Sequence, residues 1–307
     1  MRLGLMIMAD EWPDASIKAV LDYARRAEEL KFDDLWMANI FGLDALTSLA
    51  LIGQVTEKIG LGTAVTPTYP RHPTAMAQQA LTTAAASNNR LTLGIGLSHK
   101  MVIEDMLGLN YDKPARHMRE YLEVLMPLLR GEQVSYSGDQ YRVNAGIRVA
   151  GTSSVPCVVA ALGPLMLKLA GTLADGTTTW MTGPKTIEGH IAPSIQDAAK
   201  DAGKASPSIV CGLPIALTSQ SQAARAKLDK SLEIYGILPS YRAMLDREGA
   251  AGPGDVAIIG DEKELRQKIL QLRDIGVTHF NAAIADVDEG AAERTLAFLA
   301  DLKPELS

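Results

Sequence analysis

Apolar residues along this chain occur in short continuous runs that alternate with longer segments of helical spacing. Most of the runs are apolar or small at every position, which is typical of strands buried on both faces of a parallel sheet. The eight predicted strands are Leu3 to Ile7, Asp34 to Met37, Ile59 to Val65, Leu91 to Ile95, Pro156 to Ala161, Thr177 to Met181, Ile209 to Leu217 and His279 to Ile284. Such alternation is the pattern that parallel strands with crossover helices require.

The segments between the runs are predicted to be amphipathic helices. One apolar stripe follows Pro13 and Asp14 and consists of Ile17, Val20, Leu21, Ala24, Ala27 and Leu30. A second begins at Pro114 and ends before Gly131. Asp261 and Glu264 have the spacing of a capping box ahead of a third. Each stripe can cover one face of a sheet.

Eight strands with intervening helices match a closed barrel, although an open doubly wound sheet shows the same alternation. The glycine pair Gly94 and Gly96 lacks the third glycine of a dinucleotide-binding turn, which favours the barrel. Residues 131–155 contain a predicted hairpin around the turn at 137–139, and residues 237–256 form a second excursion. We therefore expect one (β/α)8 TIM-barrel domain over residues 1–307, with these two insertions at its C-terminal rim.

Composition narrows the class of protein. The chain has 307 residues, of which 47% are hydrophobic, and a formal charge of −6, so it can bury one large core and has no basic surface for nucleic acid or anionic lipid. No cationic leader or long apolar run is present, so we expect no membrane association and a cytoplasmic location. Cys157 and Cys211 lie in apolar runs without metal-ligand spacing, which indicates buried, reduced thiols.

The residues just after each strand are the candidates for a site, because barrel enzymes place their chemistry at the C-terminal ends of the strands. After the fifth strand, Gly163 permits a close approach of the backbone and Pro164 suits the first position of a helix. The free backbone N–H groups at such a helix start can bind phosphate. An ordinary strand-to-helix turn has the same sequence features.

Three other strand ends carry polar or stiff segments. Residues 62–73 contain three closely spaced prolines that make the chain extended, with Arg71 and His72 available for a ligand, for solvent or for the next helix start. Ser98 and His99 follow the fourth strand, and His99 is the candidate for proton transfer, although a lone histidine in a loop is often non-catalytic. Asn39 can bind a polar ligand edge or turn the chain.

The sequence contains no metal-ligand cluster, no nucleophile elbow and no Walker sequence. Apolar strand ends with few acids or bases favour a protein in which a bound cofactor carries the difficult chemistry.

Four stretches together resemble the luciferase-like monooxygenase superfamily, and within it the oxidoreductases that depend on coenzyme F420. They are IGLGTAVTPTYPRHP (59–73), RLTLGIGLSHK (90–100), ALGPLMLKLAGTLADGTTTWMTGP (161–184) and SYRAMLDREGAAGP (240–253). The resemblance covers nearly the whole chain. The first stretch is common to the flavin and deazaflavin branches, whereas the third is quite specific.

The resemblance implies roles for individual residues. Ala64 and Val65 match a bulge behind the deazaflavin, commonly formed by a cis peptide bond, and His99 matches an acid or base after the fourth strand. The cofactor contacts implied in this way are Asn39, Ala64, Val65, Thr66, Ser98, His99, Ala161, Leu162, Gly163, Pro164, Thr179, Trp180 and Met181. Some sugar-phosphate-oxidising relatives carry Asp-His where this chain has Asn39 and Ile40. Because this chain lacks that histidine, the resemblance does not extend to the proton-transfer mechanism or the substrate of those relatives.

The resulting hypothesis is an F420-dependent oxidoreductase that exchanges a hydride with a small organic substrate. The alternatives are an FMN-dependent luciferase-like monooxygenase and a deazaflavin-binding protein without turnover. The resemblance also implies a homodimer. We expect residues 131–150 and 237–256 to build the substrate pocket, because the barrel constrains them least.

Overall fold

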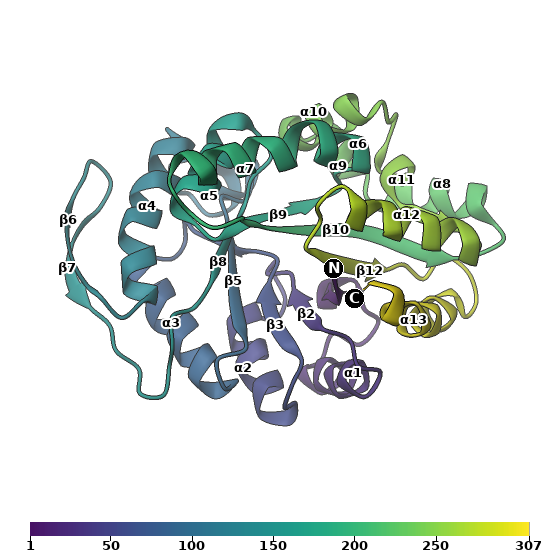
Figure 1. The fold of residues 1–307 in the computed structure, drawn as a ribbon, viewed down its shortest axis with the longest axis horizontal. Helices are drawn as coiled ribbons and strands as arrows, with labels where there is room; N and C mark the ends of the chain where they lie inside the picture. Colours follow the sequence, from purple (N-terminus) through teal and green to yellow (C-terminus); the bar gives the residue numbers. More distant parts are fainter. Residues whose placement is uncertain (307) are drawn as a thin grey trace.

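The computed structural model of the protein describes residues 1–306, and its centre is a ring of parallel strands surrounded by helices (Figure 1). The strands are β1 (Arg2–Ile7), β2 (Asp34–Met37), β3 (Gly60–Thr63), β4 (Thr66–Pro67), β5 (Leu91–Gly96), β8 (Cys157–Ala160), β9 (Gly176–Trp180), β10 (Ser208–Leu217), β11 (Ile258–Gly260) and β12 (His279–Ile284). Pairing of β10 with both β9 and β12 closes the ring through β1, β2, β3, β5 and β8. The prediction of a closed eight-stranded barrel is confirmed.

The differences from the predicted strands are local. The third expected strand ends at Thr63, and the short β4 continues the pairing with β5 after a two-residue interruption. β11 was not predicted, and it pairs only with the end of β10, outside the ring.

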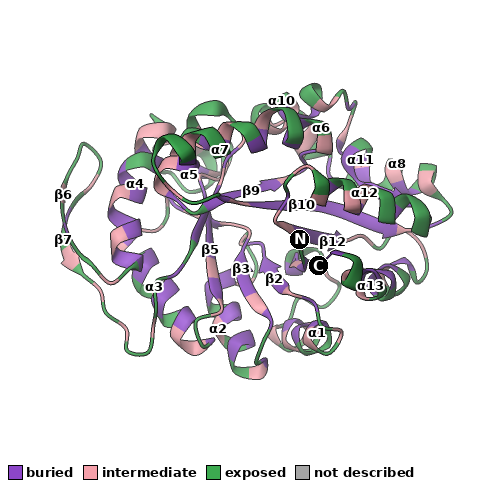
Figure 2. Ribbon diagram, in the orientation of Figure 1, coloured by how far each residue is buried: buried purple, intermediate pink, exposed green. Residues whose placement is uncertain are grey.

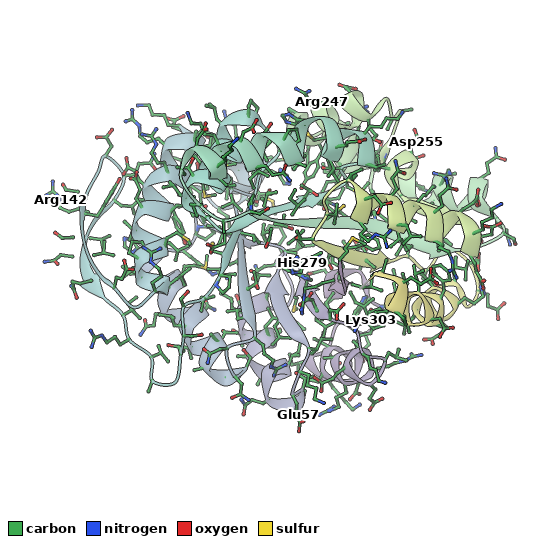
Figure 3. All side chains as sticks on the ribbon, in the orientation of Figure 1. Glu57, Arg142, Arg247, Asp255, His279 and Lys303 are labelled. Atoms are coloured by element: carbon green, nitrogen blue, oxygen red, sulfur yellow. The ribbon has the colours of Figure 1, made fainter. Side chains whose placement is uncertain are left out.

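Helices cover the outside of the ring, and Figure 2 shows their inner faces buried and their outer faces exposed. The helices are η1 (Ala9–Glu11), α1 (Ile17–Glu29), α2 (Ala45–Val55), α3 (Pro73–Ala86), η2 (Val102–Met106), α4 (Pro114–Leu129), α5 (Pro164–Leu173), α6 (Pro184–Thr186), η3 (Ile187–Ile191), α7 (Ala192–Asp201), α8 (Ser221–Ser231), α9 (Glu233–Ile237), α10 (Pro239–Glu248), α11 (Pro253–Val256), α12 (Glu262–Asp274), α13 (Ala291–Leu302) and η4 (Lys303–Leu306). The expected capping box at the start of α12 is confirmed. Charged side chains such as Glu57, Arg142, Arg247 and Asp255 point away from the barrel (Figure 3).

The predicted hairpin is present and consists of the antiparallel strands β6 (Gln133–Ser137) and β7 (Arg142–Gly146). It lies along the outside of α4 in Figure 1. The buried carboxylate of Glu120 on α4 accepts hydrogen bonds from the backbone N–H groups of Asp139, Gln140 and Tyr141 at the tip of the hairpin. These bonds hold the hairpin against the helix.

Among residues 1–306, no helix has both the length and the apolar character that crossing a membrane requires. Cys157 and Cys211 are buried free thiols, as expected, and burial raises the pKa of each.

We expect Gly94→Ala to lower the free energy of unfolding by about 1 to 3 kcal/mol. A Cβ at this position would collide with the backbone oxygen of Thr63, whose hydroxyl also bonds the Gly94 N–H and C=O. Urea denaturation measures the effect. Gly189→Ala is the matched control, because a Cβ at Gly189 meets nothing within 4 Å. Equal urea midpoints for the wild type and Gly94→Ala would contradict the close approach of Gly94 to the Thr63 backbone oxygen.

Candidate active site

A cavity of about 610 Å³ opens where the parallel strands end. Its floor consists mainly of small residues, namely Ala38, Ala64, Gly96, Ala160 and Gly212. Ala38, Ala64, Gly96 and Ala160 lie at or just after the ends of β2, β3, β5 and β8, and Gly212 lies within β10. Small-molecule sites typically have about 300 to 1,000 Å³ and a few polar groups among apolar walls. The cavity therefore has the size and the kind of lining that suit a drug-sized ligand.

The interruption between β3 and β4 forms one side of this floor. The Ala64–Val65 peptide bond is cis, as the family resemblance implied, and both residues line the cavity. Val65 packs so closely over Gly96 that a Cβ there would lie 2.6 Å from Val65 Cγ2. Thr66 is buried in the pairing with β5 and does not line the cavity. The bulge thus presents two of its three predicted residues.

The turn between β8 and α5 forms another side. Leu162 and Gly163 line the cavity, and Gly163 immediately precedes α5. The first bond of that helix runs from the Leu167 N–H to the Gly163 carbonyl, so the earlier N–H groups have no acceptor within the helix. A Cβ on Gly163 would meet nothing within 4 Å, which leaves open space in front of these donors. The geometry suits a phosphate or another anion.

His190 supports this turn from the neighbouring element η3. Its Nε2 lies 2.8 Å from the Leu162 carbonyl oxygen. Ala161, which precedes the turn, is fully buried, and Pro164 is the first residue of α5. Neither of them is a lining residue.

His99 and Ser98 line the cavity after β5. Ser98 has a positive φ of 60°, and the ring of His99 lies 5.8 Å from that of Tyr241, between centroids. Burial lowers the pKa of His99 below its ordinary value of 6.5. The imidazole is consequently uncharged at neutral pH and can accept a proton.

Thr179 and Trp180 line the cavity from β9, as predicted, whereas Met181 is buried in the main core with a φ of 53°. Asn281 lies on β12 and lines the cavity, and it was not predicted as a site residue. Its buried Oδ1 has no hydrogen-bond partner within residues 1–306. Because buried polar atoms are nearly always satisfied, Asn281 fits a contact with a polar ligand edge.

Asn39 and Arg71 combine structural and cavity-facing roles, whereas His72 has a structural role alone. Asn39 lines the cavity, and its Oδ1 accepts a hydrogen bond from the Ala45 N–H at the start of α2. Arg71 also lines the cavity, and its guanidinium is paired with Asp44 at 2.7 Å. His72 caps α3 instead.

The rest of the cavity wall comes from segments that do not directly follow a strand, so the search of the strand ends did not identify them. Val102 and Ile103 in the π-helical turn η2, followed by Tyr111, close one side. Tyr235 and Tyr241, on α9 and α10, close another. Ser240 and Tyr241 fall in the excursion at 237–256, but the hairpin at 131–150 contributes no lining residue, so the expectation that it lines this pocket was wrong. It was wrong because the hairpin packs outward on α4.

No group of three or more metal-ligating side chains occurs in the described part of the chain, residues 1–306. What the geometry provides is a lining with several small residues, a helix start with free backbone N–H groups, one uncharged imidazole and one unsatisfied amide. This combination is typical of a (β/α)8-barrel enzyme that holds an organic cofactor at the C-terminal ends of its strands.

The sequence model of the luciferase-like monooxygenase family matches residues 1–298, and the chain belongs to this family. It is 27% identical over 301 residues to a 5,10-methylenetetrahydromethanopterin reductase of Methanolobus tindarius, covering 88% of this chain and 91% of the relative. It is 28% identical over 257 residues to a putative coenzyme F420-dependent oxidoreductase of Mycobacterium tuberculosis, covering 76% and 72%.

Solved structures share the fold. The coenzyme F420-dependent tetrahydromethanopterin reductase of Methanopyrus kandleri superimposes with a TM-score of 0.82 at 22% identity, covering 100% of this chain and 99% of that one. An F420-dependent secondary alcohol dehydrogenase gives a TM-score of 0.80 at 19% identity, with 100% and 99% covered. At these identities the likeness shows the fold alone.

Proposed function

We propose that this protein is an F420-dependent oxidoreductase that exchanges a hydride with a small organic substrate. The observation that carries the proposal is the cavity, in which a floor of mainly small residues leads to the helix start at Leu162 and Gly163. A tricyclic ring with a phosphate-bearing side chain suits such a cavity. The relatives that are named as F420-dependent support the choice of cofactor.

In this proposal the chain positions the cofactor and the deazaflavin supplies hydride transfer. The floor residues and Val65 support the ring, the backbone N–H groups around Gly163 hold the phosphate, and Asn281 binds a polar ring edge. Thr179 and Trp180 contribute lining from β9. The apolar walls exclude water.

His99 handles the proton that accompanies oxidation of a hydroxyl or reduction of a carbonyl. It is the one histidine that lines the cavity among residues 1–306. Its lowered pKa favours the uncharged form, so His99 acts as the base when a hydroxyl substrate is oxidised. Tyr241 beside it keeps its proton, because burial raises the pKa of the phenol.

The homodimer and the cytoplasmic location stay predictions, and so does the small-molecule substrate.

We expect the purified protein to bind F420 more tightly than FMN. Both cofactors carry a tricyclic ring and a phosphate, so the turn at Gly163 suits either, and the choice rests on the likeness of the 161–184 and 90–100 stretches to the deazaflavin branch. Fluorescence titration with each cofactor measures the two dissociation constants. Tighter binding of FMN would support an FMN-dependent monooxygenase instead. Tight F420 binding without turnover of any substrate would indicate a binding protein.

A further inference from the structure

Large apolar side chains that are exposed to solvent gather around the mouth of the cavity that holds His99. Within residues 1–306 ten such side chains occur, and nine of them lie in segments that also supply cavity lining, namely Ile40, Phe41, Met101, Met106, Leu107, Leu109, Leu165, Ile234 and Ile237. The tenth, Leu51, lies on α2 and does not line the cavity. Single exposed apolar side chains are ordinary, whereas a group of them at one place often marks a binding surface.

Three of these side chains reach from the cavity to solvent. Ile40, Phe41 and Leu107 line the cavity, and they are 43%, 61% and 41% exposed. Ile40 and Phe41 follow β2, and Leu107 follows the π-helical turn η2. The apolar lining therefore continues from the cavity onto the surface. A ligand that fills the cavity can keep contact with apolar side chains outside it.

The side of the cavity around His99 is apolar and aromatic. The ring of Tyr241 lies 5.8 Å from that of His99, Tyr235 meets Tyr241 edge to face at 4.9 Å, and Trp180 lies 6.1 Å from Tyr235, all between centroids. The segment after His99 adds aliphatic lining from Val102, Ile103 and Leu107. These surfaces favour packing against an uncharged apolar body.

The charge of the lining restricts the ligand further. Among residues 1–306 no aspartate, glutamate or lysine lines the cavity, and Arg71 is the only lining residue with a permanent charge. Its guanidinium is already paired with Asp44. The start of α5 at Gly163 is used by the cofactor phosphate in the proposed function. A charged substrate would lose its water without gaining a free partner of opposite charge, which is unfavourable.

The volume of the cavity limits how much of a substrate can enter. In the proposed function the space of about 610 Å³ holds the tricyclic ring of the cofactor, and the substrate must also reach His99. The remaining space suits the reacting end of a substrate. The rest of a longer molecule would extend through the mouth, where Phe41 and Leu107 offer apolar surface.

We propose that the substrate is an uncharged, lipophilic alcohol, or the corresponding carbonyl compound, whose apolar chain extends from the reacting carbon beside His99 to the rim at Phe41 and Leu107. The inference rests on the proposed function. Oxidation of such an alcohol moves a hydride from the carbinol carbon to the deazaflavin and the hydroxyl proton to His99, and the carbonyl compound remains. Sugar phosphates and carboxylates are excluded, because no cation of the lining is free of an acidic partner.

Three secondary alcohols that differ only in chain length test the apolar path: 2-butanol, 2-hexanol and 2-octanol. We measure kcat/KM with the F420-loaded protein and the dissociation constants by calorimetry. Each methylene that the walls bury should improve both by up to about fourfold, so we expect 2-octanol to exceed 2-butanol by at least about tenfold. Equal values for the three alcohols would overturn the proposal.

The exclusion of charge is tested with 2-hydroxyoctanoate, which carries a carboxylate where 2-octanol has a methyl group. Its chain and hydroxyl are otherwise the same. We expect the dissociation constant of 2-hydroxyoctanoate to be at least about tenfold higher than that of 2-octanol, because the carboxylate loses its water in an apolar lining. Binding as tight as that of 2-octanol would overturn the proposed substrate class.

A substitution at the rim tests the location of the chain. Leu107→Gln replaces apolar surface by an amide of similar size, and Leu51→Gln is the matched control, because Leu51 is 44% exposed but lies outside the cavity. We expect only Leu107→Gln to lower the ratio of 2-octanol to 2-butanol kcat/KM, by at least about threefold. The F420 dissociation constant should stay unchanged in both variants.

Phe41→Gln tests the other side of the mouth and serves if Leu107→Gln does not fold, which thermal melting reports. Wild-type chain-length ratios in both Leu107→Gln and Phe41→Gln would overturn the proposed path along the rim.

Failure of the proposed function gives a different result. A protein that binds 2-octanol more tightly than 2-butanol, but neither binds F420 nor oxidises any alcohol, would contradict the proposed function and leave the ligand class standing. F420-dependent turnover that does not rise with chain length would overturn the inference and leave the proposed function standing.

Discussion

Replacing His99 by alanine is expected to lower turnover by about 10²- to 10⁴-fold while leaving the F420 dissociation constant nearly unchanged, because proton transfer by a positioned side chain usually contributes a factor of that size. His99 lines the cofactor cavity, and its pKa is lowered by burial alone. Turnover is followed by the change in deazaflavin absorbance, with a hydroxyl compound that the wild type oxidises.

The pH dependence provides a second readout of the same role. A base must be uncharged to accept a proton, so the oxidation rate falls as the pH drops through the pKa of His99. Because burial lowers this pKa, the acidic limb of the wild-type profile should lie below pH 6.5, and it should disappear in His99→Ala. An acidic limb centred above pH 6.5 would contradict the role of buried base.

His72→Ala is the matched control, because His72 caps α3 and does not line the cavity. Loss of such a cap costs about 1 kcal/mol of stability and should leave the rate unchanged. If His99→Ala retains the wild-type rate at saturating substrate, His99 is a structural residue of the loop.

The second large effect is expected for Gly163→Val, which should weaken F420 binding by at least about 100-fold, the equivalent of roughly 2.7 kcal/mol. The branched side chain would occupy the space in front of the backbone N–H groups at the start of α5 and keep a phosphate away from them. The folded chain tolerates the change, because a Cβ at Gly163 meets nothing within 4 Å and φ is −81°. Fluorescence titration with F420 measures the loss.

Gly189→Val controls for the addition of a valine near the same turn. Gly189 lies in η3 beside His190, a Cβ there also meets nothing within 4 Å, and the residue does not line the cavity. Its F420 affinity should match that of the wild type. Unchanged binding in Gly163→Val would remove the phosphate site from this turn without affecting the barrel fold.

The strand and helix pattern could be predicted from the sequence because its signals are local. A strand buried on both faces must be apolar throughout, and the cap at Asp261 depends on residues three positions apart. The rule that barrel sites lie at the C-terminal ends of the strands then indicated Leu162, Gly163 and His99. All three line the cavity.

The same rule failed where exposure to the cavity depends on the direction of a single side chain. Thr66 and Met181 are close in sequence to lining residues but are buried behind the wall. Adjacent residues of a strand point to opposite sides, and the breaks after β3 and β9 set which residue faces inward. Which residues face the cavity cannot be predicted from a run whose residues are apolar or small on both faces of the strand.

By itself the sequence determined the eight strands, the main covering helices, the absence of a basic surface and the position of the turn at Leu162 and Gly163, since each depends on composition or on neighbours a few residues apart. Only the tertiary structure decided that Tyr241 reaches His99, that the hairpin packs outward on α4, and that Asn281 lines the cavity. These contacts join residues tens to hundreds of positions apart. They depend on how the ring closes and how the helices pack around it, and no local pattern encodes that geometry.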